Sequence, residues 1–288
     1  MKASAVVATL SGAATAPGTN QAGACEIASA AQALPAEVRE TSGLARGRSN
    51  TDILWTHNDK GNTPDLFALG PDGKIRSRVR VTNARISDWE DIEAGACGTR
   101  NCLYIADIGD NSEGRAGVVI YEVLEPQLPA NQTTVLSTIN ARYADGAQDA
   151  EALFRLPNGE FYVVTKGRKN PIKLYHLSAA AVNGQRILQP VRELAQRPRR
   201  SDDRITAATA SPDGNFVAIR SYSTLTVYRT PDLLEKAGAP FVTYALTPLG
   251  QKQGESIVLE NDGSVWLSSE AEQLNALPSL ARLRCNLR

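Results

Sequence analysis

Acidic side chains gather in one stretch of the chain, residues 87–111, where they alternate with two short apolar runs. The stretch holds Asp88, Glu90, Asp91, Glu93, Asp107, Asp110 and Asn111. Apolar neighbours such as Trp89, Ile92 and Ile105 are expected at buried strand positions, so the acids between them must face a second surface or one another. Carboxylates brought together in this way can bind a hard cation or share protons.

The same pattern recurs along the chain: a polar or acidic residue, an apolar strand, a turn and a second apolar strand. Three of the turns contain Asn or Asp followed by Gly, which supply the positive φ that a tight hairpin requires. The repeats cover residues 40–59, 87–111, 148–167, 204–223 and 253–271. A further strand is expected after each repeat, at residues 65–69, 118–124, 172–177, 225–229 and 281–285. The sequence therefore predicts an all-β chain.

A repeat of roughly 50 residues with about four strands is typical of a β-propeller blade. Such units fill the chain from residue 40 onward, and we predict a single β-propeller with five blades, or six if a degenerate blade lies within residues 125–148. The last unit lacks a fourth strand. Residues 25–39 can supply it, which would close the ring by pairing the N- and C-terminal strands. A sandwich or open barrel is the alternative, but the fixed repeat argues against it.

Aligning the turns makes one position equivalent in every repeat. The aligned residues are Ser42, Glu90, Glu151, Thr206 and Glu255. The first strand of each propeller blade lines the central channel, so these residues would form a ring near one mouth. Carboxylates facing one channel repel each other unless a cation or shared protons neutralise them, so we predict bound Ca²⁺ or a raised pKa on at least one. Oxygen ligands without a histidine cluster favour Ca²⁺, and after it Mg²⁺, over zinc.

The second strands of the repeats add polar side chains to the same mouth. Asp107 and Glu270 are predicted to join the three aligned glutamates as metal ligands. Lys166 and Arg220 are predicted catalytic residues that stabilise negative charge developing on a substrate, while a metal-bound water attacks it. Any one of these acids, taken alone, could equally cap a turn or accept backbone hydrogen bonds between blades.

Four cysteines allow three pairings. Cys97 and Cys102 are near enough to close a small hairpin loop, which leaves Cys25 and Cys285 to join the two ends of the chain. A zinc site is the rival interpretation, but the cysteines do not form two close pairs and the sequence has 2 histidines. We predict two disulfides and therefore an oxidising compartment.

Residues 1–24 have the features of a secretory signal followed by a flexible segment. Lys2 precedes an apolar and small-residue run, and Ala14-Thr15-Ala16 is a candidate cleavage site ahead of Pro17. We predict cleavage near Ala16, a propeller domain at residues 25–288 and a secreted or periplasmic location; an alanine-rich tail is the alternative interpretation.

The bulk composition narrows the classes of partner. The chain has 31 basic and 31 acidic side chains, so it lacks the net positive charge that nucleic-acid binding usually requires. No stretch reaches the 18 or so apolar residues of a membrane-spanning helix. We predict a monomer that acts on a small anionic or ester substrate.

Four short motifs resemble those of secreted bacterial β-propellers related to the phytase-like group, which includes members with esterase-like activity. They are Trp89-Glu90-Asp91-Ile92, Ile105-Ala106-Asp107-Ile108-Gly109-Asp110-Asn111, Asp149-Ala150-Glu151-Ala152-Leu153 and Gly254-Glu255-Ser256-Ile257. The resemblance implies a calcium-bearing acidic channel mouth that hydrolyses a phosphoester or ester. The chain departs from the group at Thr206-Ala207, where an acid would extend the ring, and in showing five units where phytase-like propellers have six blades.

Together these features predict a secreted Ca²⁺-dependent hydrolase of a phosphoester, or of a related ester or lactone. A non-catalytic binding propeller, whose channel carboxylates are structural, is the main alternative. A glycosidase is the third, and it requires two carboxyl groups about 5 to 9.5 Å apart. A sugar-binding cleft is expected to be rimmed by aromatic side chains. Aromatic residues make up 6% of the chain, so the glycosidase is the least favoured of the three functions.

Overall fold

The computed structural model describes residues 23–182, 184–235, 238–271 and 276–288. The predicted cleavage site near Ala16 lies outside these residues. The described chain is built from strands, with one short helix, α1 (Thr230–Leu234), and three single-turn 3₁₀ segments, η1 (Ala36–Val38), η2 (Ser201–Asp203) and η3 (Thr247–Leu249). None of the described helices has the length and hydrophobicity needed to cross a membrane. The prediction of an all-β chain is confirmed.

Strands that follow one another in the chain pair antiparallel into four-stranded units. The first unit is β2 (Thr41–Arg46), β3 (Leu54–Asn58), β4 (Asp65–Leu69) and β5 (Ile75–Thr82). The second is β6 (Trp89–Cys97), β7 (Arg100–Asp107), β8 (Val118–Leu124) and β9 (Gln132–Tyr143). The third is β10 (Ala150–Arg155), β11 (Phe161–Thr165), β12 (Ile172–Val182) and β13 (Gln185–Ala195). The fourth is β14 (Ile205–Ala210), β15 (Phe216–Ser221), β16 (Thr224–Arg229) and β17 (Val242–Ala245).

The last unit joins the two ends of the described chain. Strands β18 (Gly254–Leu259), β19 (Ser264–Ser269) and β20 (Ser279–Cys285) pair in order, and β1 (Cys25–Ala33) pairs antiparallel with β20. Cys25 lies opposite Cys285, and the two form a disulfide. A second disulfide, Cys97–Cys102, closes the hairpin between β6 and β7. The predicted terminal strand pairing and both disulfides are confirmed, and no cysteine is left for zinc.

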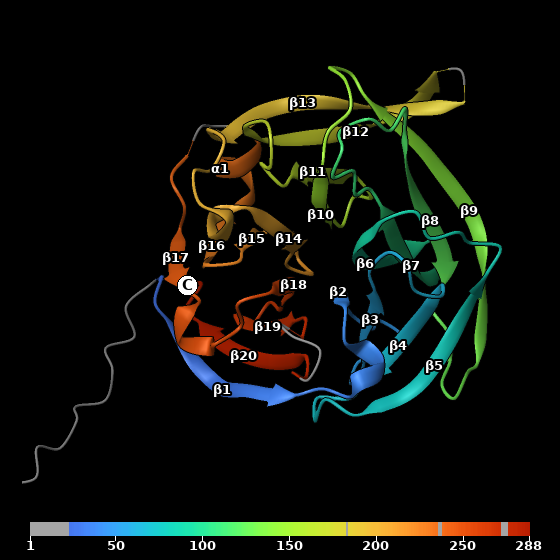
Figure 1. Cartoon of the computed structure of the whole chain (residues 1–288), viewed down its shortest axis with the longest axis vertical. Helices are drawn as coiled ribbons and strands as arrows, with labels where there is room; N and C mark the ends of the chain where they lie inside the picture. The colour runs from blue at the N-terminus through green and yellow to red at the C-terminus, as the bar shows by residue number, and fades with distance from the viewer. Residues whose placement is uncertain (1–22, 183, 236–237, 272–275) are drawn as a thin grey trace, which may run out of the picture.

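The units surround a common centre. In Figure 1 the first strands (β2, β6, β10, β14 and β18) lie nearest the middle, and the fourth strands lie at the periphery. The first strands contact one another in turn, and β18 returns to β2. At the periphery, β5 and β13 each pair parallel with β9, which extends one hydrogen-bonded sheet across three units.

Burial explains which strands lie inside. The middle strands β3, β4 and β11 are buried along their whole length, whereas β9 is mostly exposed. Apolar side chains of neighbouring units pack against each other: Phe154 and Val164 of the third unit share a cluster with Ala208 and Ile219 of the fourth. The hydrophobic core therefore lies between the units, and the inner ends of the sheets are held in fixed positions.

Glu125, just after β8, anchors the loop between β2 and β3. The backbone N–H groups of Arg48 and Ser49 donate to its Oε2 at 3.0 and 2.8 Å, and Trp55 Nε1 donates to its Oε1 at 3.2 Å. Only 2% of Glu125 is exposed. One carboxylate therefore accepts hydrogen bonds from several N–H groups of this loop.

Replacing Glu125 with glutamine is expected to lower the free energy of unfolding by about 2 kcal/mol, because an amide N–H₂ would face backbone donors. Urea unfolding followed by circular dichroism measures the change. The exposed Glu193→Gln variant is the matched control and is expected to stay within about 0.5 kcal/mol of the parent. Equal stability of the two variants would contradict the anchoring role.

Candidate functional site

β-Bulges set the direction of the aligned side chains. Trp89 lies opposite Asp107 and Asp91 opposite Ala106, so Glu90 is an extra residue in its strand. The same shift occurs at Glu151, Thr206 and Glu255. A bulge leaves its extra residue outside the ladder and redirects the side chain. The repeat therefore places one redirected residue at the same end of each of these inner strands.

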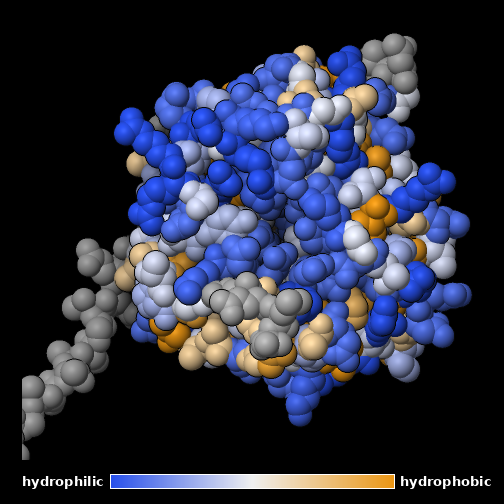
Figure 2. Space-filling view, in the orientation of Figure 1, coloured by the Kyte–Doolittle hydropathy of each residue, from blue (hydrophilic) through white to orange (hydrophobic). Residues whose placement is uncertain are grey.

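The redirected glutamates meet at a cavity of about 170 Å³. All the residues that line it are polar: Ser42, Asp59, Lys60, Glu90, Asn111, Glu151, Lys166, Arg168, Tyr222, Gln253, Glu255 and Glu270. Figure 2 shows that hydrophilic side chains predominate around the centre of the face turned to the viewer. We call the 170 Å³ cavity the acidic mouth.

Two of the aligned positions carry hydroxyls in place of acids. The Ser42 hydroxyl donates to the Glu90 carbonyl at 2.8 Å, and the Thr206 hydroxyl donates to the Gly254 carbonyl at 2.7 Å. Each bond runs from one inner strand to the bulge of the next unit. Ser42 and Thr206 therefore connect neighbouring units, and the acids are left free to face the cavity.

A second set of side chains enters from the residues directly after the second strands. Asp59, Lys166, Tyr222 and Glu270 follow β3, β11, β15 and β19, respectively. The N–H of Lys166 donates to the Asp149 carbonyl at 2.9 Å and that of Glu270 to the Gln253 carbonyl at 2.8 Å, which continues the pairing by one residue. The structure thus brings the predicted Lys166 and Glu270 to the glutamates, together with Asp59 and Tyr222.

Asp107 does not line the acidic mouth. It ends β7, one residue earlier than the set just described, and adjacent strand residues point to opposite faces. Its carboxylate accepts from the N–H groups of Ser87 and Asp88, at 2.8 and 3.2 Å, and pairs with Arg115 at 2.8 Å. These contacts satisfy the Asp107 carboxylate. Asp107 therefore lies apart from the glutamates with which it was predicted to bind a metal.

Arg220 also lies outside the lining of the acidic mouth. It is fully buried in β15, and its Nη1 donates to the carbonyls of Ser256 and Ser268, both at 2.9 Å. Its guanidinium packs against Gly254, where a Cβ would be 1.6 Å from Nη2. Burial lowers the pKa of Arg220 to about 10. This arginine therefore connects two units beneath Glu255 and does not reach a substrate in the mouth, which corrects its predicted catalytic role.

Other acids of residues 87–111 also have structural roles. The Asp91 carboxylate accepts from the N–H groups of Ile92 and Leu153, both at 2.9 Å, and of Ala208 at 3.4 Å. The Asp110 carboxylate accepts from the Ser112 hydroxyl at 2.9 Å and the Arg115 N–H at 2.6 Å. Asp91 thereby ties together three inner strands below the acidic mouth.

Lys166 supplies a cation inside the acidic mouth. Its ammonium forms a buried ion pair with Glu151 and lies 5.9 Å from the centre of the Tyr222 ring. Burial lowers the pKa of Lys166, but Glu151, Tyr222, Glu255 and Glu90 together raise it above its ordinary value. The chain itself therefore neutralises part of the charge of the acidic ring through Lys166.

The glutamates of the acidic mouth, Glu151 included, hold their protons more strongly than usual. Burial, followed by the charges of Glu151 and Asp59, raises the pKa of Glu90 well above its ordinary range. Burial is also the largest cause that raises the pKa of Glu151 to about 8, of Glu255 to about 7 and of Glu270 to about 8. Near neutral pH the acidic mouth therefore holds both protonated and ionised carboxyl groups.

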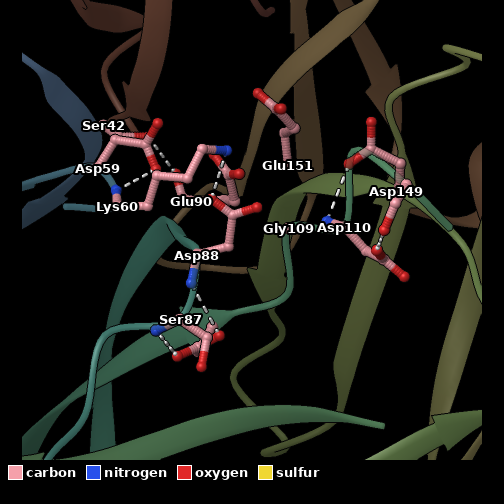
Figure 3. A network of polar contacts seen from close by, with 12 residues as sticks. Ser42, Asp59, Lys60, Ser87, Asp88, Glu90, Gly109, Asp110, Asp149 and Glu151 are labelled. Carbon is pink, nitrogen blue, oxygen red and sulfur yellow. Dashed lines mark hydrogen bonds and ion pairs between the residues drawn. The ribbon is translucent and has the colours of Figure 1, made fainter. Parts of the chain in front are cut away.

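Three carboxylates at one side of the mouth are suited to a divalent cation. One oxygen each from Asp59, Asp88 and Glu90 lies within 4.8 Å of the others. Asp88 and Glu90 both pack on Gly109, where a Cβ would be 2.7 Å from Asp88 Oδ2 and 2.1 Å from Glu90 Oε1. Figure 3 shows this group with Lys60, whose Nζ donates to Asp88 Oδ1 at 2.9 Å. The alignment of the repeats selected neither Asp88 nor Lys60, because both lie in loops, although Asp88 is one of the acids of residues 87–111.

The sequence matches no protein family model and no curated protein. The structure is similar to the PQQ-bound aldose sugar dehydrogenase of Streptomyces coelicolor, with a TM-score of 0.50 and 8% identity over 91% of this chain and 98% of that one. It is also similar to virginiamycin B lyase from Staphylococcus aureus (TM-score 0.42, 14% identity, 87% of this chain and 68% of that one). The Dos1 propeller is a further match (TM-score 0.37, 14% identity, 79% and 52%).

The fold is that of a β-propeller. Inner strands grouped around a centre and radial antiparallel sheets are the features of this architecture. At such low sequence identity the likeness concerns the fold alone, because one fold hosts many functions. The chemistry of this propeller must be argued from the acidic mouth.

Proposed function

We infer that the four-stranded units are the blades of a five-bladed propeller, closed by the pairing of β1 with β20. Two observations support this. The inner strands contact one another in cyclic order, with β18 against β2. Residues 125–148, where a sixth blade was considered, contain β9, which already serves as the outer strand of the second unit.

We propose that the acidic mouth binds Ca²⁺ and hydrolyses a small phosphoester, or a related ester or lactone. The observation that carries the proposal is the convergence of Asp59, Asp88 and Glu90, whose carboxylate oxygens lie within 4.8 Å of one another beside a buried lysine–glutamate pair. Carboxylate oxygens are the ligands that Ca²⁺ prefers. Mg²⁺ is the weaker candidate, because it demands near-ideal octahedral geometry.

Asp59, Asp88 and Glu90 would hold the ion. When bound, a cation at this site lowers the pKa of a coordinated water and offsets charge on a phosphoryl or carbonyl oxygen. Lys60 has a half-exposed side chain, so it can leave Asp88 for an anionic substrate. Lys166 and Arg168 add positive charge at the same cavity and would orient that substrate.

Glu255 is suited to proton transfer in this mechanism. Its pKa is raised to about 7, first by burial, and its Oε2 has no hydrogen-bond partner among the described residues. A group that titrates near the working pH can both donate and accept a proton. Glu255 would therefore give a proton to the leaving oxygen, while Arg220 beneath it keeps its strand in place.

Calcium is expected to stabilise the metal-stripped protein. At a concentration 100 times its Kd, Ca²⁺ should add about 2.7 kcal/mol to the free energy of unfolding. Glu90→Gln and Asp59→Asn should each abolish most of this gain, since each removes one charged ligand. Thermal melts with and without Ca²⁺ measure the effect, with the exposed Glu160→Gln variant as control. A gain that survives in both ligand variants would place the ion elsewhere.

The catalytic part of the proposal is tested on the same proteins. Release of p-nitrophenol from p-nitrophenyl phosphate and p-nitrophenyl acetate, and opening of a γ-lactone, should require Ca²⁺ and be lost in Glu90→Gln. Calcium-dependent stabilisation without turnover of any of these three substrates would overturn hydrolysis and retain metal binding.

A non-catalytic binding propeller is the second candidate function. The ion pair between Lys166 and Glu151 favours it, because the chain neutralises part of its own acidic ring. The small cavity does not favour a glycosidase. At about 170 Å³, with Tyr222 the sole aromatic residue among its described lining, the acidic mouth lacks the features of a sugar-binding cleft.

A further inference from the structure

A second cavity lies at the opposite end of the inner strands. Its volume is about 340 Å³, and it is lined by the C-terminal parts of β2, β6, β10, β14 and β18. Its polar and charged lining comprises Arg46, Arg48, Glu93, Asn101, Arg155, Thr209, Ser211 and Glu260. We call it the basic mouth. None of its lining residues also lines the acidic mouth.

The two mouths are separated by the inner strands themselves. Asp91 lies between Glu90 of the acidic mouth and Glu93 of the basic mouth, and its carboxylate bonds to backbone N–H groups of Leu153 and Ala208. Gly43 packs so closely on Asp91 that a Cβ there would be 2.9 Å from the Asp91 Cα. The basic mouth is therefore a pocket with its own floor and is independent of the proposed calcium site.

The charges of the basic mouth favour an anion. Arg46 is paired with Glu260 at 2.6 Å. Arg48 is exposed, and the described residues offer its guanidinium no ion-pair partner. Arg155 donates to the Ala96 carbonyl at 3.0 Å and packs over the Tyr104 ring, and it too has no ion-pair partner in the part of the chain that the structure describes. Arg48 and Arg155 therefore form no ion pair among the described residues, although the charge of Arg155 acts on Glu93.

Glu93 is a buried acid in the lining of the basic mouth. It is only 8% exposed, and its Oε1 has no hydrogen-bond partner among the described residues. A buried polar atom without a partner is costly, so such an atom beside a cavity indicates a ligand. Burial, followed by the charge of Asp91, raises the pKa of Glu93 well above its ordinary range. The Glu93 carboxyl group therefore keeps its proton to a higher pH than usual, and in that protonated form it can donate an O–H hydrogen bond.

We propose that the basic mouth binds a small organic anion, whose carboxylate or phosphate group is held by Arg48 and Arg155 and whose body hydrogen-bonds to Glu93. The volume of about 340 Å³ is at the lower end of small-molecule pockets and far exceeds the space of one water or ion. The occupant is therefore a metabolite-sized molecule with an oxygen that can accept from the Glu93 carboxyl.

Isothermal titration at neutral pH tests the charge requirement. D-Gluconate presents a carboxylate, D-glucose 6-phosphate presents a phosphate, and D-glucose is the uncharged control. At least one of the two anions should bind saturably, and glucose should not. Arg48→Gln should weaken binding about fivefold, whereas Arg199→Gln, which removes an exposed arginine elsewhere, should leave it unchanged.

Variants of Glu93 test the polar end. Glu93→Gln keeps an N–H donor and should bind within about twofold of the parent, whereas Glu93→Leu removes it and should weaken binding about tenfold. Circular dichroism melts verify that each variant is folded. Loss of binding in Glu93→Gln would overturn the neutral donor and indicate a cationic group on the ligand. The site would be overturned if neither anion bound saturably. It would also be overturned if Arg48→Gln and Glu93→Leu bound the anion with the same affinity as the parent protein.

Discussion

Replacing Lys166 with methionine is expected to lower the free energy of unfolding by about 3 to 5 kcal/mol at pH 8, because removing one partner of a buried ion pair leaves the other uncompensated. Lys166 has a side chain that is 7% exposed and Glu151 one that is 5% exposed, so water cannot replace the lost ammonium. Glu255 and Glu90 also lose the cation that offsets their mutual repulsion. Urea unfolding at pH 8 measures the loss.

Lys60→Met is the matched control for this variant. Lys60 lines the same mouth and also pairs with an acid, Asp88, but 46% of its side chain is exposed. Solvent screening limits such a pair to about 1 kcal/mol or less. A loss in Lys166→Met no larger than that in Lys60→Met would contradict the central role of the buried pair.

The double variant Lys166→Met/Glu151→Gln separates charge from packing. Removing the unpaired carboxylate should restore a large part of the stability lost in Lys166→Met, since a neutral amide is less costly to bury than a carboxylate. The loss should also be smaller at pH 5, where the carboxyl groups of the mouth are protonated. A double variant as unstable as the single one would assign the effect to lost packing of the lysine stem.

Repeats in the sequence were sufficient to predict the sheets. The turns at Pro157-Asn158-Gly159 and Asn261-Asp262-Gly263 are local signals, and each lies between paired strands of the structure. The alignment of Glu90, Glu151 and Glu255 succeeded for the same reason: one bulge recurs at one place in the repeat. Local, repeated features of this kind need no knowledge of distant contacts.

The positions of Asp107 and Arg220 relative to the acidic mouth could not be predicted from the sequence. Both are charged and lie near the ends of second strands, but each is one or two residues short of the position that faces the acidic mouth. For Asp107 a shift of one residue reverses the face of the strand, and composition alone does not define the register. Arg220 lies two residues before Tyr222, deeper in β15, where it donates to the carbonyls of Ser256 and Ser268. Lys60 was missed because it lies in a loop, where no periodic pattern indicates its position. Asp88 was recognised as one acid of residues 87–111 but was not assigned to the site, because it also lies in a loop.

Glu93 shows a different limit. The sequence identified it as one of a group of acids, but only the structure places it at the basic mouth, three residues along β6 from Glu90. After the bulge at Glu90, strand β6 runs from the acidic mouth to the basic mouth, and Asp91 links it to neighbouring strands on the way. One acidic stretch therefore serves two opposite mouths and the connection between them.

Without divalent cations, the free energy of unfolding is expected to fall as the pH rises from about 5 to 8.5. In the folded protein the pKa of Glu151 is raised from 4.5 to about 8, that of Glu270 to about 8 and that of Glu255 to about 7. The folded state therefore binds more protons than the unfolded state across this window, and stability must decrease with pH. The contribution is complete below about pH 4.5 and is lost once the pH passes about 8.

The total change is expected to be on the order of 3 kcal/mol, because these carboxyl groups titrate as a coupled set and Lys166 offsets part of their charge. Urea unfolding at a series of pH values measures it. The double variant Glu151→Gln/Glu270→Gln should flatten the profile, since neither amide titrates, while the exposed control Glu160→Gln should keep it. Added Ca²⁺ should reduce the fall in stability toward high pH, because the ion binds the carboxylate form of its ligands. Stability that rises from pH 5 to 8.5 in metal-free protein would show that these acids are ionised in the folded state, and that Lys166 and the backbone alone hold the acidic mouth together.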